Sequence, residues 1–444
     1  MFRSHRALVA FVVALGAAVP AHAQTPAPLA GLLLNFFSPS NPVVLKSNPV
    51  PQFSHAAHFM SQPGAQATLR ELNSGIASQL STFPIGSSSG GFTFTFDESL
   101  GVYNRTTESF GPIFTERPLS TGKGKFTFGV NYQQATYDSF QGKDLSSGDL
   151  TLYLLHLDVN RDGSNLNPWF EGDIIRANLS IDLDVKTTVL FASFGASERL
   201  DLGVALPFQD VSLSARIDTN IERLATASDP FVVHIFDDNT SEHIFQQSGS
   251  ASGIGDLLIR GKYNFLRRPR GSLAAALDLR LPTGDENDLL GSGATQAKLF
   301  VIAGGSTGRF SPRGSFGYTF SNGGSDFTGD LPDELYYTAG FDVVPHRRVS
   351  VAADLIGRTL LHTDKVVDHQ SVFQYRTRLD PTVLETTRTE LGTERGNLNL
   401  LLGSVGIKIN PVGRLLLVAN ALFKVGNNGL QDKVTPTFGI DYTF

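Results

Sequence analysis

The sequence predicts an all-β protein, a transmembrane antiparallel up-and-down β-barrel. Long segments alternate apolar and polar residues, the connections between them alternate between short and long, and the last strand ends on Phe444. Strands that span a membrane need about 9–11 residues, whereas strands of soluble proteins average about five or six. Because many of these segments reach about ten residues, we expect a membrane barrel rather than a soluble sandwich.

Composition supports many strands and excludes several classes of function. The chain has 33 Phe and 44 Gly but only 2 Met, which suits strands and tight turns better than helices. It has no cysteine, so disulfides, thiolate metal sites and cysteine nucleophiles are excluded. The net charge is -6 and no basic tract stands out, so nucleic acid is not an expected partner.

The first 23 residues have the layout of a secretory signal peptide. A basic start, "MFRSHR", precedes an apolar run and the small-residue sequence "AHA" before Gln24. The run is too short for a membrane-spanning helix. Later stretches also fall short of about 20 continuous apolar residues, so we expect no transmembrane helix in the mature chain.

Residues 24–88 form an irregular, proline-rich stretch with one helical pattern. In "AQATLRELNSGIASQL", apolar residues recur at the spacing of one helix face. We expect this segment to be a partly helical plug of the barrel or a periplasmic segment, and residues 89–444 to form the barrel. The residues of the helical face are Leu69, Leu72, Ile76 and Leu80.

The charges of the alternating segments lie on the face opposite the apolar one. In "LSIDLDVKTTVLF", Ile181 and Leu183 alternate with Asp182 and Asp184. We expect the apolar faces to meet lipid and the charged faces to line the lumen. Cross-strand ion pairs are the favoured role, and a selectivity ring or a binding surface for the plug is the alternative. The expected lumen-lining residues are Asp182, Asp184, Lys186, Asp256, Arg260, Lys262, Asp278, Arg280, Asp354 and Arg358.

The segments predict about fourteen strands, within a range of about 12–16, because single-chain barrels have an even number. The segment "DLTLYLLHLDV" also has a strand pattern, but an odd strand would break this parity, so we place it in an outer loop. Tight connections such as "ASER" and "PHRR" predict periplasmic turns, and the long ones predict outer loops. The predicted strands are a hairpin in 90–109, one strand in 123–138, pairs in 174–219, 254–283, 296–322, 334–361 and 396–425, and a last strand at 433–444.

The terminal sequence "VTPTFGIDYTF" puts Phe438, Ile440, Tyr442 and Phe444 on one strand face. A barrel closes by pairing its last strand with its first, since an open edge in lipid leaves backbone groups unpaired. The ending resembles the C-terminal insertion signal of bacterial outer-membrane proteins. This resemblance implies the bacterial outer membrane as location, with outer-membrane lipid, lipopolysaccharide and the barrel-assembly machinery as partners.

Two stretches resemble a known family of outer-membrane proteins. They are "TGKGKFTFGVNYQ" at 121–133 and "LPTGDENDLLGSGATQAKLFVIAG" at 281–304. They resemble the group named after the phenol meta-pathway, which is related to FadL-type transporters. The resemblance implies a passive channel for small hydrophobic or aromatic compounds, gated by the N-terminal segment. A general diffusion porin for polar solutes and a structural or adhesive barrel are the alternatives.

One loop has part of a calcium-binding pattern. In "DVNRDGSN", Asp158, Asn160 and Asp162 stand at alternate positions before a glycine, as in a calcium loop. The twelfth position is Trp169 rather than the bidentate Glu that such loops require. A turn built from Asn, Asp and Gly is therefore favoured, with calcium as the lesser alternative and no other cofactor expected.

Four histidines are candidates for metal ligands or catalytic residues. His55 and His58 are one helical turn apart and could share a metal, but the usual supporting ligands are missing, so a polar helix face or loop is favoured. His234 and His243 lie in an expected outer loop without a recognisable nucleophile context. We therefore expect no enzymatic activity.

Overall fold

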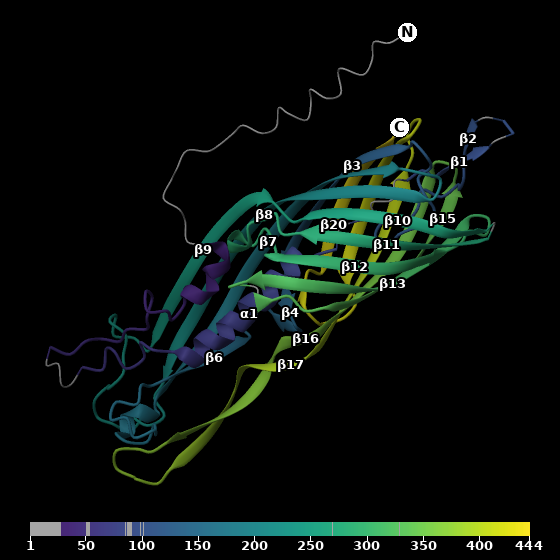
Figure 1. The fold of residues 1–444 in the computed structure, drawn as a ribbon. Coiled ribbons are helices and arrows are strands. Elements are labelled where there is room, and N and C mark those ends of the chain that lie inside the picture. The colour runs from purple at the N-terminus through teal and green to yellow at the C-terminus, as the bar shows by residue number, and fades with distance from the viewer. Residues whose placement is uncertain are drawn as a thin grey trace, which may run out of the picture.

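The computed structural model describes residues 28–49, 54–84, 86, 91–97, 99–100, 102–268, 270–327 and 329–444. The predicted signal peptide, residues 1–23, lies outside this range. Twelve strands of the described chain close into one antiparallel barrel, in which each strand pairs with the next and β20 pairs with β3 (Figure 1). They are β3 (Phe126–Tyr137), β7 (Ile174–Gly195), β8 (Leu200–Glu222), β10 (Leu257–Arg268), β11 (Gly271–Leu281), β12 (Ala294–Gly304), β13 (Phe310–Ser325), β15 (Glu334–His346), β16 (Val349–Tyr375), β17 (Leu384–Ile409), β18 (Leu415–Lys424) and β20 (Val434–Thr443).

The predicted fold class and the closure of the last strand on the first are confirmed. The wall has twelve strands rather than fourteen because the predicted hairpin at 90–109 is not part of it. This hairpin forms a separate two-stranded sheet of β1 (Phe94–Asp97) and β2 (Val102–Arg105). Strands of four residues are too short to cross a bilayer, which takes about 9–11. Each of the other twelve predicted strands corresponds to one strand of the wall.

Four wall strands continue well beyond the length that a bilayer needs. β7, β8, β16 and β17 have 22, 23, 27 and 26 residues, against about 9–11 for a membrane crossing. We call the region that they build the outer part, and it extends to the lower left in Figure 1. The opposite end, with Phe444 and the short turns, is called the inner end.

Shorter strands complete the outer part without joining the closed wall. β6 (Leu150–Leu155) pairs with the first third of β7, so the segment "DLTLYLLHLDV" lies outside the ring, as expected. β9 (Glu242–Ile254) pairs with the second half of β8. The remaining elements are β4 (Ser139–Phe140), β5 (Lys143–Asp144), β14 (Gly329–Asp330), β19 (Leu430–Gln431) and the short 3-10 helices η1 (Leu29–Gly31), η2 (Leu33–Asn35), η4 (Trp169–Gly172) and η5 (Glu286–Asp288).

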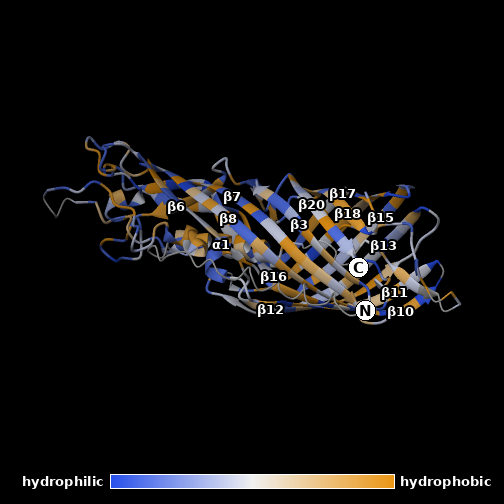
Figure 2. Ribbon diagram, turned by 90° about the horizontal axis from the view of Figure 1, so that it is seen from above, coloured by the Kyte–Doolittle hydropathy of each residue, from blue (hydrophilic) through white to orange (hydrophobic). Residues whose placement is uncertain are grey.

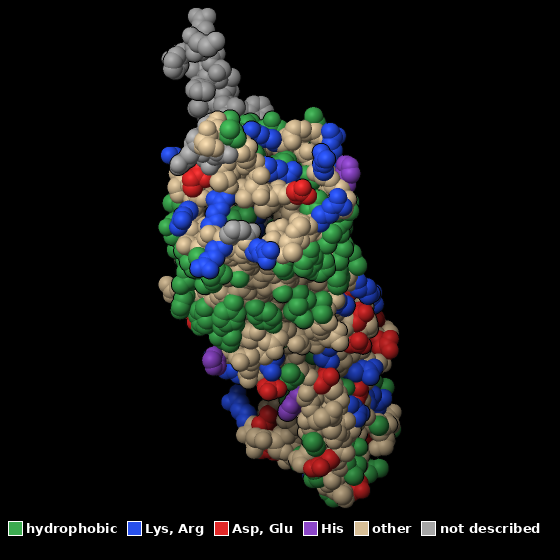
Figure 3. All heavy atoms as spheres, turned by 90° about the vertical axis from the view of Figure 1, so that its right-hand side faces the viewer, with side chains coloured by type: hydrophobic (Ala, Val, Ile, Leu, Met, Phe, Trp, Pro, Cys, Tyr) green, Lys and Arg blue, Asp and Glu red, His purple; other side chains and the backbone are tan. Residues whose placement is uncertain are grey.

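A belt of exposed apolar side chains surrounds the barrel. Phe316, Leu299 and Phe438 keep 63%, 57% and 56% of their surface exposed, which is unusual for water-facing residues of this size. Figure 3 shows the belt as a green band, with Lys and Arg gathered between it and the inner end. Hydrophobic and hydrophilic residues alternate along the strands (Figure 2). The chain is therefore a transmembrane β-barrel of the kind found in bacterial outer membranes.

Helix α1 (Pro63–Ser81) lies between the strands of the outer part (Figure 1). Pro63 occupies its first position, where a missing N–H costs nothing. The predicted apolar face, including Leu69 and Ile76, is buried against the inner faces of β6, β7 and β8. No helix in the described ranges is long and apolar enough to cross a membrane.

The residues of the expected insertion signal lie on the outward face of β20. Phe438 pairs with Tyr132 of β3 in the ladder that closes the barrel. Replacing Phe438 by Arg would place a charge on this lipid-facing side. We expect the free energy of unfolding in phospholipid vesicles to fall by about 2–4 kcal/mol, the cost of Arg near the bilayer centre.

Urea unfolding followed by tryptophan fluorescence measures this effect. The control is Lys433→Arg, which changes a largely exposed side chain just before the same strand. Equal stability of Phe438→Arg and the unaltered protein would contradict the lipid-facing position.

Candidate functional site

Residues 109–121, here called the inner strap, run inside the barrel and bind the inward faces of its strands. Asp354 of β16 accepts hydrogen bonds from the backbone N–H groups of Ile113 (3.1 Å) and Phe114 (3.0 Å) and from the hydroxyl of Thr115. Asp354 is almost fully buried, so these three donors replace the water that its carboxylate loses. The strap is therefore bonded to the inward face of β16.

The opposite side of the lumen holds the strap in a similar way. Lys262 of β10 donates hydrogen bonds of 3.1 Å to the carbonyl oxygens of Arg117 and Leu119. Asp201 of β8 accepts one from the hydroxyl of Ser120 and lies 3.3 Å from the Lys262 ammonium. A positive and a negative wall residue thus share the task of binding backbone and hydroxyl groups of the strap.

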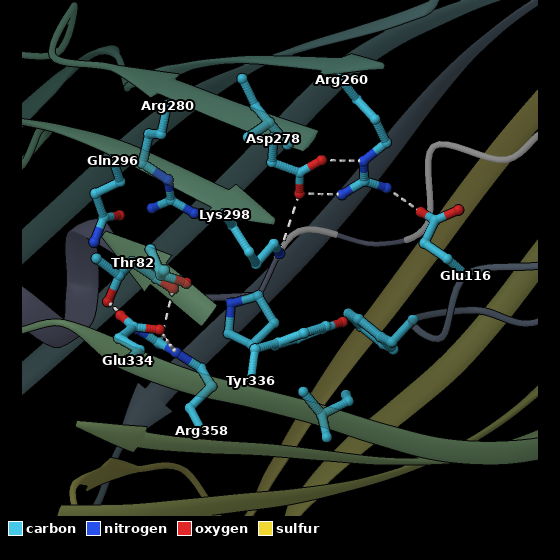
Figure 4. A pocket seen from close by; sticks show the side chains of 15 residues that line it. Thr82, Glu116, Arg260, Asp278, Arg280, Gln296, Lys298, Glu334, Tyr336 and Arg358 are labelled. Atoms are coloured by element: carbon cyan, nitrogen blue, oxygen red, sulfur yellow. Dashed lines mark hydrogen bonds and ion pairs between the residues drawn. The ribbon is translucent and has the colours of Figure 1, made fainter. Parts of the chain in front are cut away.

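Further toward the outer part, a buried ion network joins the strap to three wall strands (Figure 4). Arg260 of β10 lies between Glu116 of the strap and Asp278 of β11, with its Nε 2.5 Å from the Asp278 carboxylate. Lys298 of β12 approaches the same carboxylate to 3.1 Å and lies 4.2 Å from the centre of the Tyr336 ring. Each buried charge therefore has an opposite charge in contact, as burial requires.

A second group of charges holds the C-terminal end of α1. Arg358 of β16 donates to Glu334 of β15 (2.9 Å) and to the carbonyl and hydroxyl oxygens of Thr82 (2.9 and 2.8 Å). Arg280 of β11 donates to the carbonyl of Ser81. The last carbonyls of a helix have no partner within it and carry partial negative charge. Two guanidinium groups satisfy them here.

Between these two groups of charges lies a cavity of about 80 Å³, and the residues labelled in Figure 4, among them Tyr336, line it. This volume holds a few water molecules, since one needs about 10–15 Å³ on the same measure. Sites for small organic ligands are usually about 300–1,000 Å³. A small organic molecule would therefore pass this cavity only if the strap or the end of α1 moved.

A larger cavity, of about 680 Å³, lies beside α1 at the edge of the outer part. Its lining includes Arg70 and Ser74 of α1, residues 329–333 and residues 361–364 of β16. β15 begins only at Glu334, and its pairing with β16 ends at Leu360. Beyond that point β16 pairs with β17 alone among the described strands, which leaves its other side open to the cavity.

Seven of the ten expected lumen residues have side chains that point into the barrel. Asp256 accepts hydrogen bonds from Gly284 and Ser292 of an outer loop, and the others bind the strap, the end of α1 or each other. They combine the two roles considered from the sequence, cross-strand ion pairs and a binding surface for an inner segment. The seven are Asp256, Arg260, Lys262, Asp278, Arg280, Asp354 and Arg358.

The lumen assignment is wrong for Asp182, Asp184 and Lys186. They lie on the outward face of β7, while Ile181 and Leu183 of the opposite face are buried with α1. The predicted alternation is present, but this half of β7 lies in the outer part. There the outward face meets water and the inside is filled by an apolar helix, so the two faces exchange roles.

The calcium-like loop forms a turn through its own side chains. The carboxylate of Asp158 accepts the N–H groups of Asp162 (3.2 Å) and Gly163 (2.8 Å), and the Asn160 side-chain oxygen accepts the N–H of Asp162 (3.0 Å). This is the arrangement favoured for Asn, Asp and Gly in a turn. His55 and His58 also lie in a turn, before α1; their rings contact each other, and His58 contacts His156.

Sequence reasoning missed the inner strap and its partners. Glu116 lies in an irregular stretch with no periodic signal, so its contact with Arg260 could not be anticipated. Lys298 had a usable signal, because the alternation of residues 294–304 places it on the same face as Gln296 and Phe300. In the membrane part of the wall, a charge on the face opposite the apolar belt points to the lumen, and Lys298 meets this condition.

The contact between Glu116 and Arg260 is expected to couple the strap to the wall. Glu116→Gln and Arg260→Met, made singly and together, form a double-mutant cycle measured by urea unfolding. We expect a coupling free energy of about 0.5–3 kcal/mol, the range for residues in contact within one network. Additive effects of the two substitutions would show that the strap is not held by this pair.

Comparison with known proteins finds a family model that matches part of the chain. The family model described as "Putative MetA-pathway of phenol degradation" matches residues 171–383. No curated protein matches the chain. Among solved structures, an outer membrane channel from Pseudomonas putida F1 is similar, with a TM-score of 0.44, 13% identity and coverage of 74% of this chain and 98% of that chain.

Two further structures are similar at lower scores. A FadL homologue from Pseudomonas aeruginosa has a TM-score of 0.30 and 12% identity, covering 72% of this chain and 90% of its own. The toluene transporter TbuX from Ralstonia pickettii has a TM-score of 0.26 and 10% identity, with 74% and 92% covered. The strand order, rather than these scores, establishes the barrel. Over residues 171–383, from η4 to the loop before β17, the resemblance to the phenol meta-pathway family drawn from the sequence is confirmed.

Proposed function

We propose that this protein is a passive channel for small hydrophobic or aromatic compounds in the bacterial outer membrane, gated by its own N-terminal chain. The observation that carries the proposal is the filled lumen. The inner strap is bonded to the buried Asp354, and the end of α1 is bonded to the buried Arg358. The cavity between these two segments measures only about 80 Å³. The matching family model supports the same class of protein.

Gating in this proposal is a local rearrangement of the residues that fill the lumen. A hydrogen bond contributes only about 0.5–1.5 kcal/mol net, and segments held by few contacts open far more often than the whole fold. Arg280 and Arg358 hold Thr82 and the end of α1 on the side of the lumen, and the Leu430 N–H donates to Gln79 in the last turn. Release of Thr82 and the end of α1 would open a route from the outer part to the lumen without disturbing the wall.

Solute entry is assigned in this proposal to the cavity beside α1. Its volume of about 680 Å³ falls within the usual range for organic ligands. The apolar side chains of Phe327, Leu331 and Leu361 line it together with charged residues such as Arg70 and Glu71. This mixture suits an aromatic ring that carries one polar group, because the ring packs on the apolar part and the polar group keeps a partner.

Lipid, lipopolysaccharide and the barrel-assembly machinery are the proposed partners besides the solute. The apolar belt favours contact with lipid tails, and the strands of the outer part, with 22 to 27 residues, are long enough to extend past the bilayer toward lipopolysaccharide sugars. Three exposed aromatic side chains, Phe438 and Tyr442 of β20 and Phe444 directly after it, suit recognition by the assembly machinery before the barrel closes.

A general diffusion porin is the second candidate, and it requires an open, water-filled lumen. In the porin alternative the N-terminal segment would lie in the periplasm. The hydrogen bonds from Arg280 and Arg358 of the wall to Ser81 and Thr82 favour a filled barrel instead. An adhesive barrel would act through the outer part alone. Permeability experiments separate these functions.

An introduced disulfide tests the gate directly, because the chain has no cysteine of its own. A Cβ added at Gly329 would lie 3.5 Å from the Ser74 hydroxyl oxygen, so Ser74→Cys with Gly329→Cys brings two thiols within disulfide reach. We expect cells with the oxidised form to take up radiolabelled toluene no faster than cells without the protein. Reduction should restore uptake.

The oxidised and reduced states of this one variant are matched in every other respect, including any strain at Gly329. Ser74→Cys alone is the control for the oxidant. Equal toluene uptake in both states would reject α1 as the gate. Rapid arabinose entry into liposomes in both states would instead support the porin.

Removal of the charges that hold α1 should open the barrel to ions. We expect the unaltered protein to be silent in planar bilayers and Arg280→Gln with Arg358→Gln to show frequent conductance steps. Arg348→Gln, in a turn at the inner end, is the control, because the Arg348 guanidinium donates to the Pro411 carbonyl of the neighbouring turn and takes no part in holding α1. Steady, equal conductance of all three proteins would contradict gating by the N-terminal chain.

A further inference from the structure

Four histidines from distant parts of the chain meet in the outer part. His55 and His58 come from the segment before α1, His156 follows β6, and His234 comes from the loop between β8 and β9. One ring nitrogen from each lies within 4.8 Å of the corresponding nitrogens of the other three. None of them belongs to the lumen network described above.

Two of the four rings have their tautomer fixed by a group that only accepts hydrogen bonds. His234 Nδ1 lies 2.8 Å from the carboxylate of Asp173, and His156 Nδ1 lies 2.6 Å from the carbonyl oxygen of Leu157. Asp173 also accepts hydrogen bonds from the backbone N–H of Ala225 and the hydroxyl of Thr226. Each ring therefore uses Nδ1 for an acceptor outside the group, which turns its Nε2 toward the group as the nitrogen available to a metal.

The remaining contacts place more lone pairs than hydrogens at the centre of the group. His58 Nδ1 lies 2.8 Å from His156 Nε2 and 3.0 Å from His55 Nδ1, yet it can carry only one hydrogen. His234 Nε2 has no hydrogen-bond partner among the described residues, and the side chain is fully buried. A buried acceptor without a donor costs about 1–3 kcal/mol. A cation at the centre would satisfy all four nitrogens.

The distances fit a tetrahedral ion. Zinc binds imidazole nitrogen at about 2.0–2.1 Å, which places four ligand nitrogens about 3.4 Å from one another. The pairs at 2.8 and 3.0 Å and the upper limit of 4.8 Å lie on either side of this value. Shifts well below the length of a side chain would bring the four atoms into position.

Aromatic side chains enclose the group. Phe170 lies 4.7 Å from the His55 ring centre, and Phe59 lies 5.2 Å from that of His156. An enclosed site of this kind limits access of water to the four nitrogens and holds the rings in place.

We propose that His55, His58, His156 and His234 bind one divalent transition-metal ion of the zinc class, with Asp173 orienting His234. Four protein ligands close the coordination sphere, which is typical of a structural rather than a catalytic ion. The ion would connect the segment that leads into α1 with β6 and the β8–β9 loop. It would fix the entry of the N-terminal chain into the barrel, whichever solute the barrel carries.

Zinc titration of the full mature protein, purified without a polyhistidine tag and stripped with a chelator, tests the proposal. We expect calorimetry to give one Zn²⁺ per chain. His234→Gln should lower the affinity more than 100-fold, and Asp173→Asn about 10–100-fold, the usual effect of losing a group that orients a ligand. His369→Gln, an exposed histidine of β16, is the matched control and should bind as the unaltered protein does.

A second measurement on the unaltered protein keeps the proposal falsifiable if His234→Gln fails to fold. Cobalt(II) in a tetrahedral nitrogen site absorbs strongly in the visible range, and Zn²⁺ should abolish this band at one equivalent. Zn²⁺ should also raise the thermal midpoint relative to the chelated protein, because it binds the folded state alone. The absence of a saturable site or of the cobalt band, or equal losses in His369→Gln and Asp173→Asn, would overturn the proposal.

Discussion

The need to pair every backbone N–H and C=O group in lipid is the constraint on which the structure depends. β20 meets it by pairing with β3 over residues 437–443, which closes the wall and leaves no edge in the membrane. Closure fixes which side chains face lipid, since the alternation of a strand allows only two faces. The apolar belt and the inward charges are two consequences of the same ladder.

A closed wall with inward charges creates a second requirement, because buried ions need partners. The wall supplies some, such as Asp278 for Arg260, and the N-terminal chain supplies others through Glu116, Ser81 and Thr82. Wall and filling therefore stabilise each other. Charges bonded to a movable segment also suit a gate, because their partners can be exchanged for water or solute when the segment leaves.

Beyond the bilayer the same strands follow the rules of a water-soluble protein. The inner faces of β7 and β8 pack with α1 in an apolar core, and their outer faces carry charges such as Asp182. The four histidines belong to this region, where loops from three parts of the chain meet the segment before α1. An ion there would join the gate segment to a rigid framework at its entry, far from the lumen charges that hold its end.

The sequence by itself determined the barrel, twelve of its strands and the pairing of the last with the first, because strand periodicity and chain length are local properties. Only the tertiary structure decided the hairpin at 90–109, the inner strap, the reversed faces of β7 and the meeting of His55 with His234. An alternating pattern shows that two faces differ, but not whether lipid, water or another segment covers each face. Contacts between irregular segments far apart in the chain have no periodicity, so they emerge only when the closed wall brings those segments together.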